Sequence, residues 1–180
     1  MIRAKTIADS LTVTRVLLAL LIFCLGVTGG SEALPAATTA LIFAWATDLL
    51  DGTFARRDPS PQPSWVGERD LHADVSVSVG VLAYLTFSRF VPLWASLIYV
   101  AITVVLLWHF RSRHLAMAVQ APPYALKLYT ALRYATLQGA IAVAWILLTV
   151  IVTWPRFPKE VVPSFLQGMR NLGQPSEEEQ

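Results

Sequence analysis

Four aspartates lie close together in this chain, in two pairs separated by a polar loop. Asp48 and Asp51 are three residues apart, whereas Asp70 and Asp74 are four residues apart. On a helix, either spacing places the two side chains of a pair on one face. Each pair adjoins an apolar segment, and acidic side chains beside membrane segments are costly, which favours a functional role for them.

The two apolar segments are predicted to form helices joined by the proline-containing loop. This hairpin would bring all four carboxylates to a similar depth, facing one another. Converging carboxylates without basic partners repel one another unless a cation joins them. Ligation by oxygen alone suits Mg²⁺ or Mn²⁺ rather than Zn²⁺. The pattern therefore predicts a divalent metal site, with two ions expected, that could clamp and neutralise a diphosphate.

The composition places these acids in a membrane protein. Hydrophobic residues make up 55% of the 180 residues and charged residues 14%, which is unusual for a soluble domain. We predict one membrane-embedded domain over residues 1–172 and a disordered acidic tail over 173–180. The net charge of +2 and the absence of a basic stripe argue against nucleic-acid binding.

The apolar runs predict an all-α, polytopic membrane helical bundle with five clear spans and a possible sixth element. The first span would lie within residues 11–28, and the others over residues 36–56, 70–88, 92–110 and 128–154. Residues 154–172 contain three prolines and are more typical of an interfacial segment. An alternative is that residues 115–120 enter the membrane.

Basic residues cluster in alternate turns of the predicted bundle. By the positive-inside rule, this places the amino terminus and the aspartate loop in the cytosol. The amino-terminal apolar run is also compatible with a cleaved signal peptide. With Arg15 included, however, the charged segment before the apolar part would be unusually long for such a peptide, so an uncleaved first span is favoured. For Arg15 itself, two interpretations stay open: an interfacial anchor that reaches toward water, or a group that faces a phosphate.

The aspartate stretch resembles the signature of the CDP-alcohol phosphatidyltransferase family, D-x2-D-G-x2-A-R followed by G-x3-D-x3-D. The first half is matched in full, at Asp48, Asp51, Gly52, Ala55 and Arg56. In the second half Asp70 and Asp74 match, while Gly67 lies one residue too close to Asp70 and the linker from Arg56 to Asp70 is one residue longer than usual. This departure concerns the role of Gly67, not the four acids.

Two shorter segments add to the resemblance. Residues 11–16 are similar to the L-T-x-x-R segment that opens the first helix of many members. Lys127 and Thr130 match part of a G-K-x-K-T segment, although the glycine and the second lysine are missing.

The resemblance implies transfer of a substituted phosphate from a CDP-linked donor, usually CDP-diacylglycerol, to an acceptor hydroxyl, with release of CMP. It implies four metal-binding acids (Asp48, Asp51, Asp70 and Asp74), of which Asp74 would also be the general base. It implies a pocket for cytidine diphosphate lined by Gly52, Ala55 and Arg56, with Gly67 as a further candidate. Candidates for binding the phosphate of the acceptor or of a lipid are Lys127, Thr130, Arg111 and Arg113. The family commonly forms homodimers in the membrane, so a homodimer is expected by analogy.

Other interpretations of these residues remain open. Gly52 and Ala55 could serve close helix packing rather than leave room for substrate. Lys127, Arg111 and Arg113 could be ordinary interfacial cations. Other classes compatible with the acids are an intramembrane prenyltransferase, an ion transporter and a non-catalytic homologue. Among acceptors, a phosphorylated polyol is favoured over serine or a choline-type alcohol because Lys127 and the nearby arginines could bind a second phosphate.

Overall fold

The structure is a computed structural model that describes the backbone of residues 4–55 and 70–172, and the side chains of residues 10–50 and 71–172. Within these ranges the chain is helical and contains no strand. The order of the helices is α1 (Ala4–Gly29), α2 (Leu34–Ala55), α3 (Asp70–Phe87), α4 (Leu93–Phe110), α5 (Arg113–Ala118), α6 (Ala121–Tyr134), α7 (Thr136–Val152) and α8 (Val162–Arg170). The all-α prediction is confirmed for the described residues.

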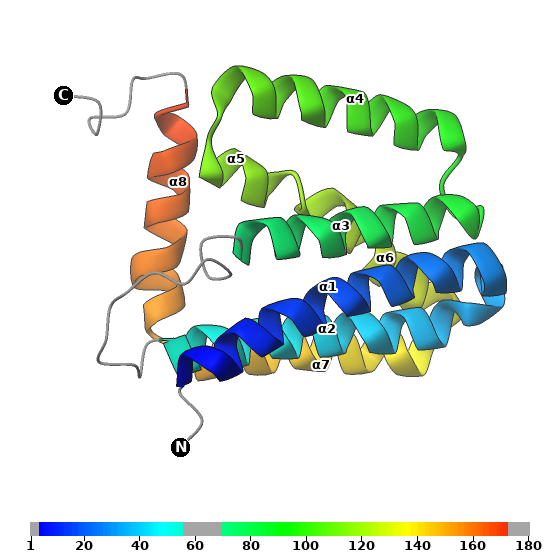
Figure 1. Cartoon of the computed structure of the whole chain (residues 1–180), viewed down its shortest axis with the longest axis horizontal. Helices are drawn as coiled ribbons and strands as arrows, with labels where there is room; N and C mark the ends of the chain where they lie inside the picture. Colours follow the sequence, from blue (N-terminus) through cyan, green and yellow to red (C-terminus); the bar gives the residue numbers. More distant parts are fainter. Residues whose placement is uncertain (1–3, 56–69, 173–180) are drawn as a thin grey trace.

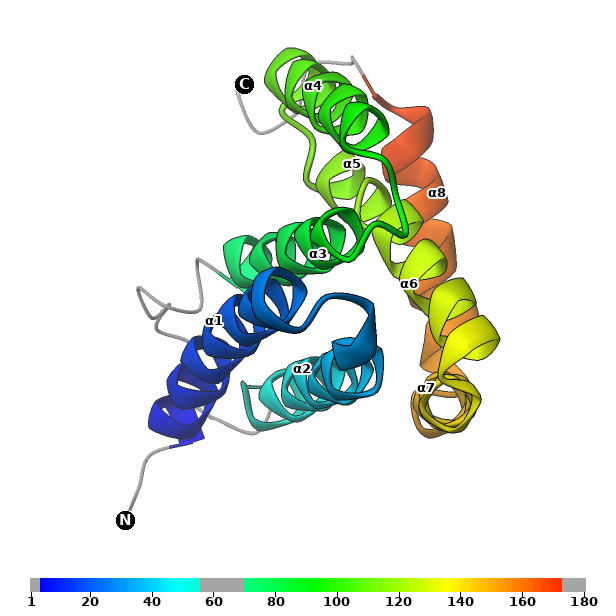
Figure 2. The ribbon, with the colours of Figure 1, turned by 90° about the vertical axis from the view of Figure 1, so that its right-hand side faces the viewer.

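Helices α1, α2 and α3 pack together, with α1 in extensive contact with both of the others (Figures 1 and 2). The first two make an antiparallel hairpin through a short 3₁₀ turn, Gly30–Ala33. The turn starts at Gly30, whose φ of +54° is a conformation that other residues rarely adopt. The third helix packs along α1, and together these helices supply most of the buried apolar side chains.

Two glycines allow α1 and α3 to approach closely. A Cβ atom at Gly80 would lie 2.6 Å from the backbone oxygen of Ala19, and one at Gly26 would lie 2.7 Å from the Cα of Tyr84. Such distances leave no space for a side chain, so both contacts join backbone to backbone. Small residues at helix interfaces are typical of membrane proteins, where close packing replaces the hydrophobic effect as the force between helices.

The predicted fifth span, 128–154, is wrong as a single helix. The chain leaves helical geometry at Ala135, with φ −140° and ψ 60°, which separates α6 from α7. The bend is compact because Gly139 of α7 lies against the backbone of α6, where its Cβ would be 2.6 Å from the nitrogen of Leu132. After α7 the chain turns by 81° into the π-helical segment Phe157–Val161 and α8.

The described residues contain fewer candidate spans than the five predicted. By length and composition, two helical stretches qualify, Ser10–Leu50 and Leu93–Phe110, and a third qualifies if α7 and the bent segment after it count as one. Ser10–Leu50 includes the α1–α2 hairpin, and Leu71–Phe87 of α3 is apolar but shorter. The expectation of five clear spans is therefore corrected: the apolar residues form shorter and bent helices.

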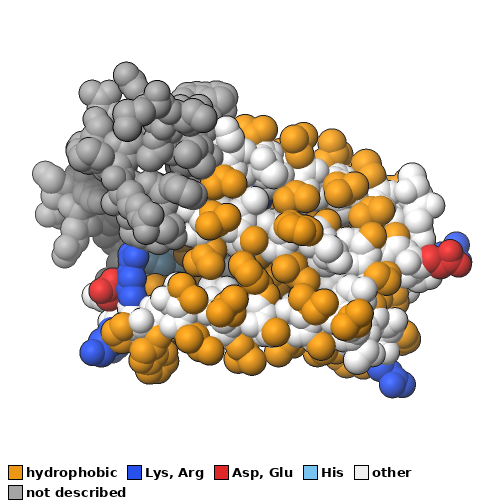
Figure 3. All heavy atoms as spheres, turned by 90° about the horizontal axis from the view of Figure 1, so that it is seen from below, with side chains coloured by type: hydrophobic (Ala, Val, Ile, Leu, Met, Phe, Trp, Pro, Cys, Tyr) orange, Lys and Arg blue, Asp and Glu red, His pale blue; other side chains and the backbone are white. Residues whose placement is uncertain are grey.

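The surface nevertheless has the pattern of a membrane protein. Figure 3 shows a face covered by hydrophobic side chains, with the visible charged side chains gathered at its two ends. Large apolar side chains such as Leu17, Leu20, Val104 and Trp108 are exposed on the helices. Exposed apolar surface of this extent marks a lipid-facing or protein-facing surface.

Candidate active site

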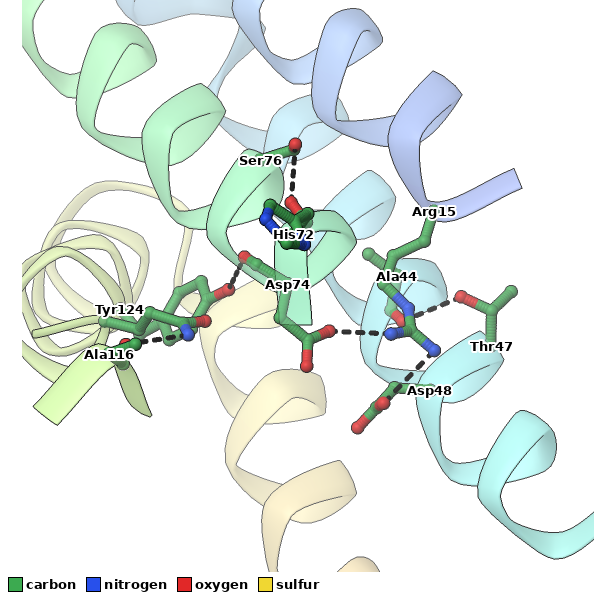
Figure 4. A network of polar contacts seen from close by, with 10 residues as sticks. Arg15, Ala44, Thr47, Asp48, His72, Asp74, Ser76, Ala116 and Tyr124 are labelled. Atoms are coloured by element: carbon green, nitrogen blue, oxygen red, sulfur yellow. Dashed lines mark hydrogen bonds and ion pairs between the residues drawn. The ribbon is translucent and has the colours of Figure 1, made fainter. Parts of the chain in front are cut away.

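A buried arginine on α1 joins one carboxylate of α2 to one carboxylate of α3. Arg15 has 1% of its side chain exposed, and its two terminal nitrogens face different acids. One nitrogen lies 3.1 Å from Oδ1 of Asp48, and the other donates a hydrogen bond of 2.7 Å to Oδ1 of Asp74. Figure 4 shows the guanidinium between the two acids, with the second oxygen of each carboxylate pointing away from it.

This arrangement corrects two expectations about the site. The interpretation of Arg15 as an interfacial anchor is wrong, because its side chain points into the contact between α1, α2 and α3. The acids also have a basic partner, contrary to the premise that they converge without one. Burial explains both findings: a charged group removed from water is stable only when opposite charges and hydrogen bonds compensate for its lost hydration.

A cavity of about 170 Å³ opens beside this ion cluster. Its lining combines polar and apolar side chains from four helices: Arg15, Ala44, Trp45, Asp48, Asp74, Val77, Gln120 and Tyr124. Both aspartates remain accessible, with 53% of the Asp48 side chain and 33% of the Asp74 side chain exposed. The cavity is therefore a small compartment with two reachable carboxylates at one side.

Helix α6 and the turn before it contribute two polar side chains to the cavity, Tyr124 and Gln120, that the sequence analysis missed. Gln120 donates its amide hydrogen to the carbonyl oxygen of Ala116 at 3.0 Å, which fixes the side chain while its own carbonyl oxygen stays available. The hydroxyl of Tyr124 lies 3.4 Å from the carbonyl oxygen of Asp74, and its ring packs edge-on against Trp45 at 5.7 Å. Gln120 caps the start of α6 and Tyr124 follows four residues later, a spacing that could have pointed to both.

The donors in this cluster suit a hard divalent cation. Asp48 and Asp74 offer carboxylate oxygens only, which is the ligand type that Mg²⁺ and Mn²⁺ prefer. Asp51 and Asp70 lie on the same two helices, one turn from Asp48 and Asp74, but their side chains fall outside the described residues. Among the side chains that the structure describes, no group of three or more potential ligands forms a metal site. The four-acid metal site thus stays a prediction with two of its members placed.

The predicted nucleotide-binding residues are covered only in part. Gly52 and Ala55 belong to the last turns of α2, a position one to two turns beyond Asp48. Arg56 and Gly67 lie outside the described residues. Their predicted roles are neither supported nor opposed by the geometry.

Lys127 is buried instead of interfacial. Its side chain is fully shielded, and its Nζ lies 3.6 Å from the centre of the Tyr84 ring, a cation–π geometry. Among the described residues Nζ has no hydrogen-bond partner. The hydroxyl of Thr130 donates to the carbonyl oxygen of Lys127 at 2.9 Å, so it is engaged within its own helix. The interpretation of Lys127 as an ordinary interfacial cation is therefore wrong.

Arg111 and Arg113 lie at a different cavity. They are exposed and line a space of about 550 Å³ between α3, α4 and α5, together with His72. Neither arginine lines the smaller cavity beside Asp48 and Asp74. The structure therefore separates the predicted phosphate-binding arginines from the two described acids.

Comparison with known proteins agrees with this architecture. A family model described as CDP-alcohol phosphatidyltransferase matches residues 5–161, which is most of the chain. The described fold is that of an all-helical protein with apolar candidate spans, and the matched family is a family of phosphotransferases. The chain belongs to the CDP-alcohol phosphatidyltransferase family. Searches of curated proteins and of solved structures found no match.

Membership of the family has direct consequences. It supports an integral membrane enzyme of phospholipid biosynthesis that uses a CDP-alcohol donor and an alcohol acceptor. Arg15, Asp48 and Asp74 all lie within the matched residues, as do Gln120 and Tyr124.

Proposed function

We propose that this protein transfers a phosphatidyl group from a CDP-diacylglycerol-type donor to the hydroxyl of a small phosphorylated polyol and releases CMP. The observation that carries the proposal is the meeting of Asp48 and Asp74 beside a small polar cavity. These acids come from different helices and occupy the first and last positions of the family signature. Carboxylates converging from two helices are suited to hold the cations that a diphosphate donor needs.

In this proposal the four aspartates would hold two divalent ions, Mg²⁺ or Mn²⁺. When bound, the ions neutralise the diphosphate and stabilise the departing CMP. Asp48 and Asp51 would contribute from α2, and Asp70 and Asp74 from α3. The oxygen-only donor set supports this assignment.

Asp74 is proposed to act as the general base. The acceptor hydroxyl attacks the phosphorus atom attached to the lipid, a new P–O bond forms, and the bond between that phosphorus and the oxygen of CMP breaks. The proton of the hydroxyl passes to the Asp74 carboxylate, because an alcohol is a poor nucleophile at neutral pH. The partial exposure of Asp74 allows the proton to leave to water afterwards.

The cavity supports a small acceptor. A volume of about 170 Å³ holds a molecule of a few carbon atoms but no acyl chain. Gln120 and Tyr124 line this space, and a side-chain amide and a phenol hydroxyl can both orient hydroxyl groups of a polyol. The lipid part of the donor would then lie at the apolar surface outside the cavity.

Further parts of the proposal follow from the sequence signature. Gly52, Ala55, Arg56 and Gly67 would contact the cytidine diphosphate. A phosphate on the acceptor would be recognised by cations among Lys127, Arg111 and Arg113, with Thr130 as a neighbouring donor. The site would face the cytosol, and residues 1–172 would form one domain in a homodimer.

The test is release of CMP by the full chain, purified in detergent and supplied with CDP-diacylglycerol and Mg²⁺. We expect release that depends on glycerol phosphate or inositol phosphate, and that stops when EDTA removes the metal. Release only with serine or a choline-type alcohol would contradict the phosphorylated acceptor. Turnover of a prenyl diphosphate in place of the CDP-linked lipid would refute the proposal, and no turnover with any acceptor would favour the non-catalytic homologue.

A further inference from the structure

Arg15 lies outside the aspartate signature, yet it makes the contacts that bring two of the aspartates together. It enters from α1, whereas the acids lie on α2 and α3. Its separation from Asp74 is 59 residues in sequence, so no local pattern links them. The contact exists only because three helices pack around one guanidinium.

The chemistry of the group suits a bridging role. A guanidinium presents several N–H donors in a rigid, planar fork and stays charged at any physiological pH. Here one terminal nitrogen faces Asp48 and the other faces Asp74, at 3.1 and 2.7 Å. Both contacts use Oδ1, and in Figure 4 the other oxygen of each carboxylate is directed away from the arginine. Arg15 therefore sets the distance and the rotation of both carboxylates at once.

The supports around Arg15 make this geometry rigid. With 1% of its side chain exposed, the arginine cannot exchange its partners for water. Its helix is locked against α3 by the backbone contact between Ala19 and Gly80, one turn further along α1. A ligand set held by fixed neighbours binds metal more tightly than one whose carboxylates must first be gathered against their mutual repulsion.

We propose that Arg15 is a positioning residue that pre-organises Asp48 and Asp74 for the divalent cation. It does not bind the metal, and it touches no reacting atom. It holds two metal ligands, one on α2 and one on α3, at a fixed distance from each other. This inference rests on the proposed metal site. Lysine cannot replace it, because a single ammonium cannot present two separate N–H groups in one plane to carboxylates on different helices.

The test is direct binding of Mn²⁺ to the full chain in detergent, followed by the electron paramagnetic resonance signal of the free ion. Arg15→Lys keeps the positive charge, so any change reports the lost bridge and not altered repulsion of the metal. We expect its Mn²⁺ affinity to fall on the order of tenfold or more. Arg133→Lys, at an exposed arginine of α6, is the matched control and should bind Mn²⁺ like the wild type.

Each outcome decides the proposal. A folded Arg15→Lys protein that binds Mn²⁺ as tightly as the wild type overturns the positioning role. If it aggregates on size-exclusion chromatography, Arg15→Gln is measured in the same way; aggregation of both variants shows a role in folding and also overturns the proposal. If wild-type protein binds Mn²⁺ no better than Asp48→Asn, the metal site of the proposed function fails instead, and Arg15 has no metal ligands to position.

Discussion

Helices α3 and α4 follow one another in the chain and run antiparallel, yet they are buried to very different degrees (Figure 1). From α3, Val77, Val81, Tyr84 and Leu85 are buried in the core. From α4, the structure buries only Ser96, whose hydroxyl lies 2.6 Å from that of Thr86. Both helices are apolar, so apolar composition alone does not determine which helix becomes part of the core.

The difference shows what each helix is suited for. Helix α3 packs against α1 at Gly80 and carries Asp74 near its start, so it can be packed tightly and hold a charge in place. Helix α4 is apolar on nearly all sides, which is the pattern of a helix surrounded by lipid or protein. The comparison predicts that changes in the unit formed by α1, α2 and α3 affect activity and stability strongly, whereas matched changes elsewhere do not.

The largest expected effect is on turnover. Asp74→Asn keeps the shape of the side chain but removes the proposed base and one metal ligand, so we expect CMP release to fall roughly 10²- to 10⁴-fold. The control is Glu160→Gln, at an exposed acid between α7 and α8. An Asp74→Asn protein with more than a tenth of wild-type turnover would contradict the assignment of Asp74.

The next effect is on stability. Gly80→Val would place side-chain atoms against the backbone of Ala19, and we expect the free energy of unfolding to fall by about 1–3 kcal/mol or more. Ala101→Val on exposed α4 adds similar apolar volume and should change it by less than about 0.5 kcal/mol. Unfolding of the two variants in mixed micelles measures this contrast. Equal losses would show that the two helices are equally constrained.

A smaller effect is expected at the cavity. Tyr124→Phe removes one hydroxyl that faces the cavity and leaves the ring packed on Trp45. The net loss of one hydrogen bond, about 0.5–1.5 kcal/mol, corresponds to a rise in KM for the acceptor of roughly two- to tenfold, with little change in KM for the donor. Tyr129→Phe, at an exposed position of the same helix, is the control. A rise in KM for the donor alone would place the lipid nucleotide, and not the acceptor, in this cavity.

Much of the fold and part of the site could be predicted from local sequence. The apolar runs located α2, α3 and α4 closely because membrane helices follow hydropathy, whereas α1 begins at Ala4, ahead of the predicted span 11–28. The break at Ala135 was missed because nothing in the local sequence distinguishes this alanine; the bend depends on how closely Gly139 approaches the backbone of α6. A helix-ending residue that owes its conformation to such packing has no signature of its own.

The candidate site, like the fold, could be predicted only in part. The positions of Asp48 and Asp74 at helix ends could be predicted, because they follow from helical periodicity and from a family signature. The pairing of Arg15 with both acids was not, because it links three helices across the fold. The burial of Lys127 was missed for the same reason: its cover comes from Tyr84 of α3, which is distant in sequence.

The smallest expected effect concerns an exposed ion pair outside the unit formed by α1, α2 and α3. Arg156 and Glu160 form an exposed ion pair with Nε and Oε2 3.0 Å apart, and 54% and 67% of their side chains are accessible. Solvent screens such a pair, so Glu160→Gln should lower the free energy of unfolding by only about 0.3–0.5 kcal/mol, and less in high salt. The contacts of Arg15 should respond less to salt, because the guanidinium side of each pair is 1% exposed. Measuring the stability of Glu160→Gln and Arg15→Lys at low and at high salt therefore distinguishes the two kinds of ion pair. A similar salt dependence in both variants would mean that the Arg15 cluster is open to solvent. The contrast between the unit of α1, α2 and α3 and the rest of the molecule would then be wrong.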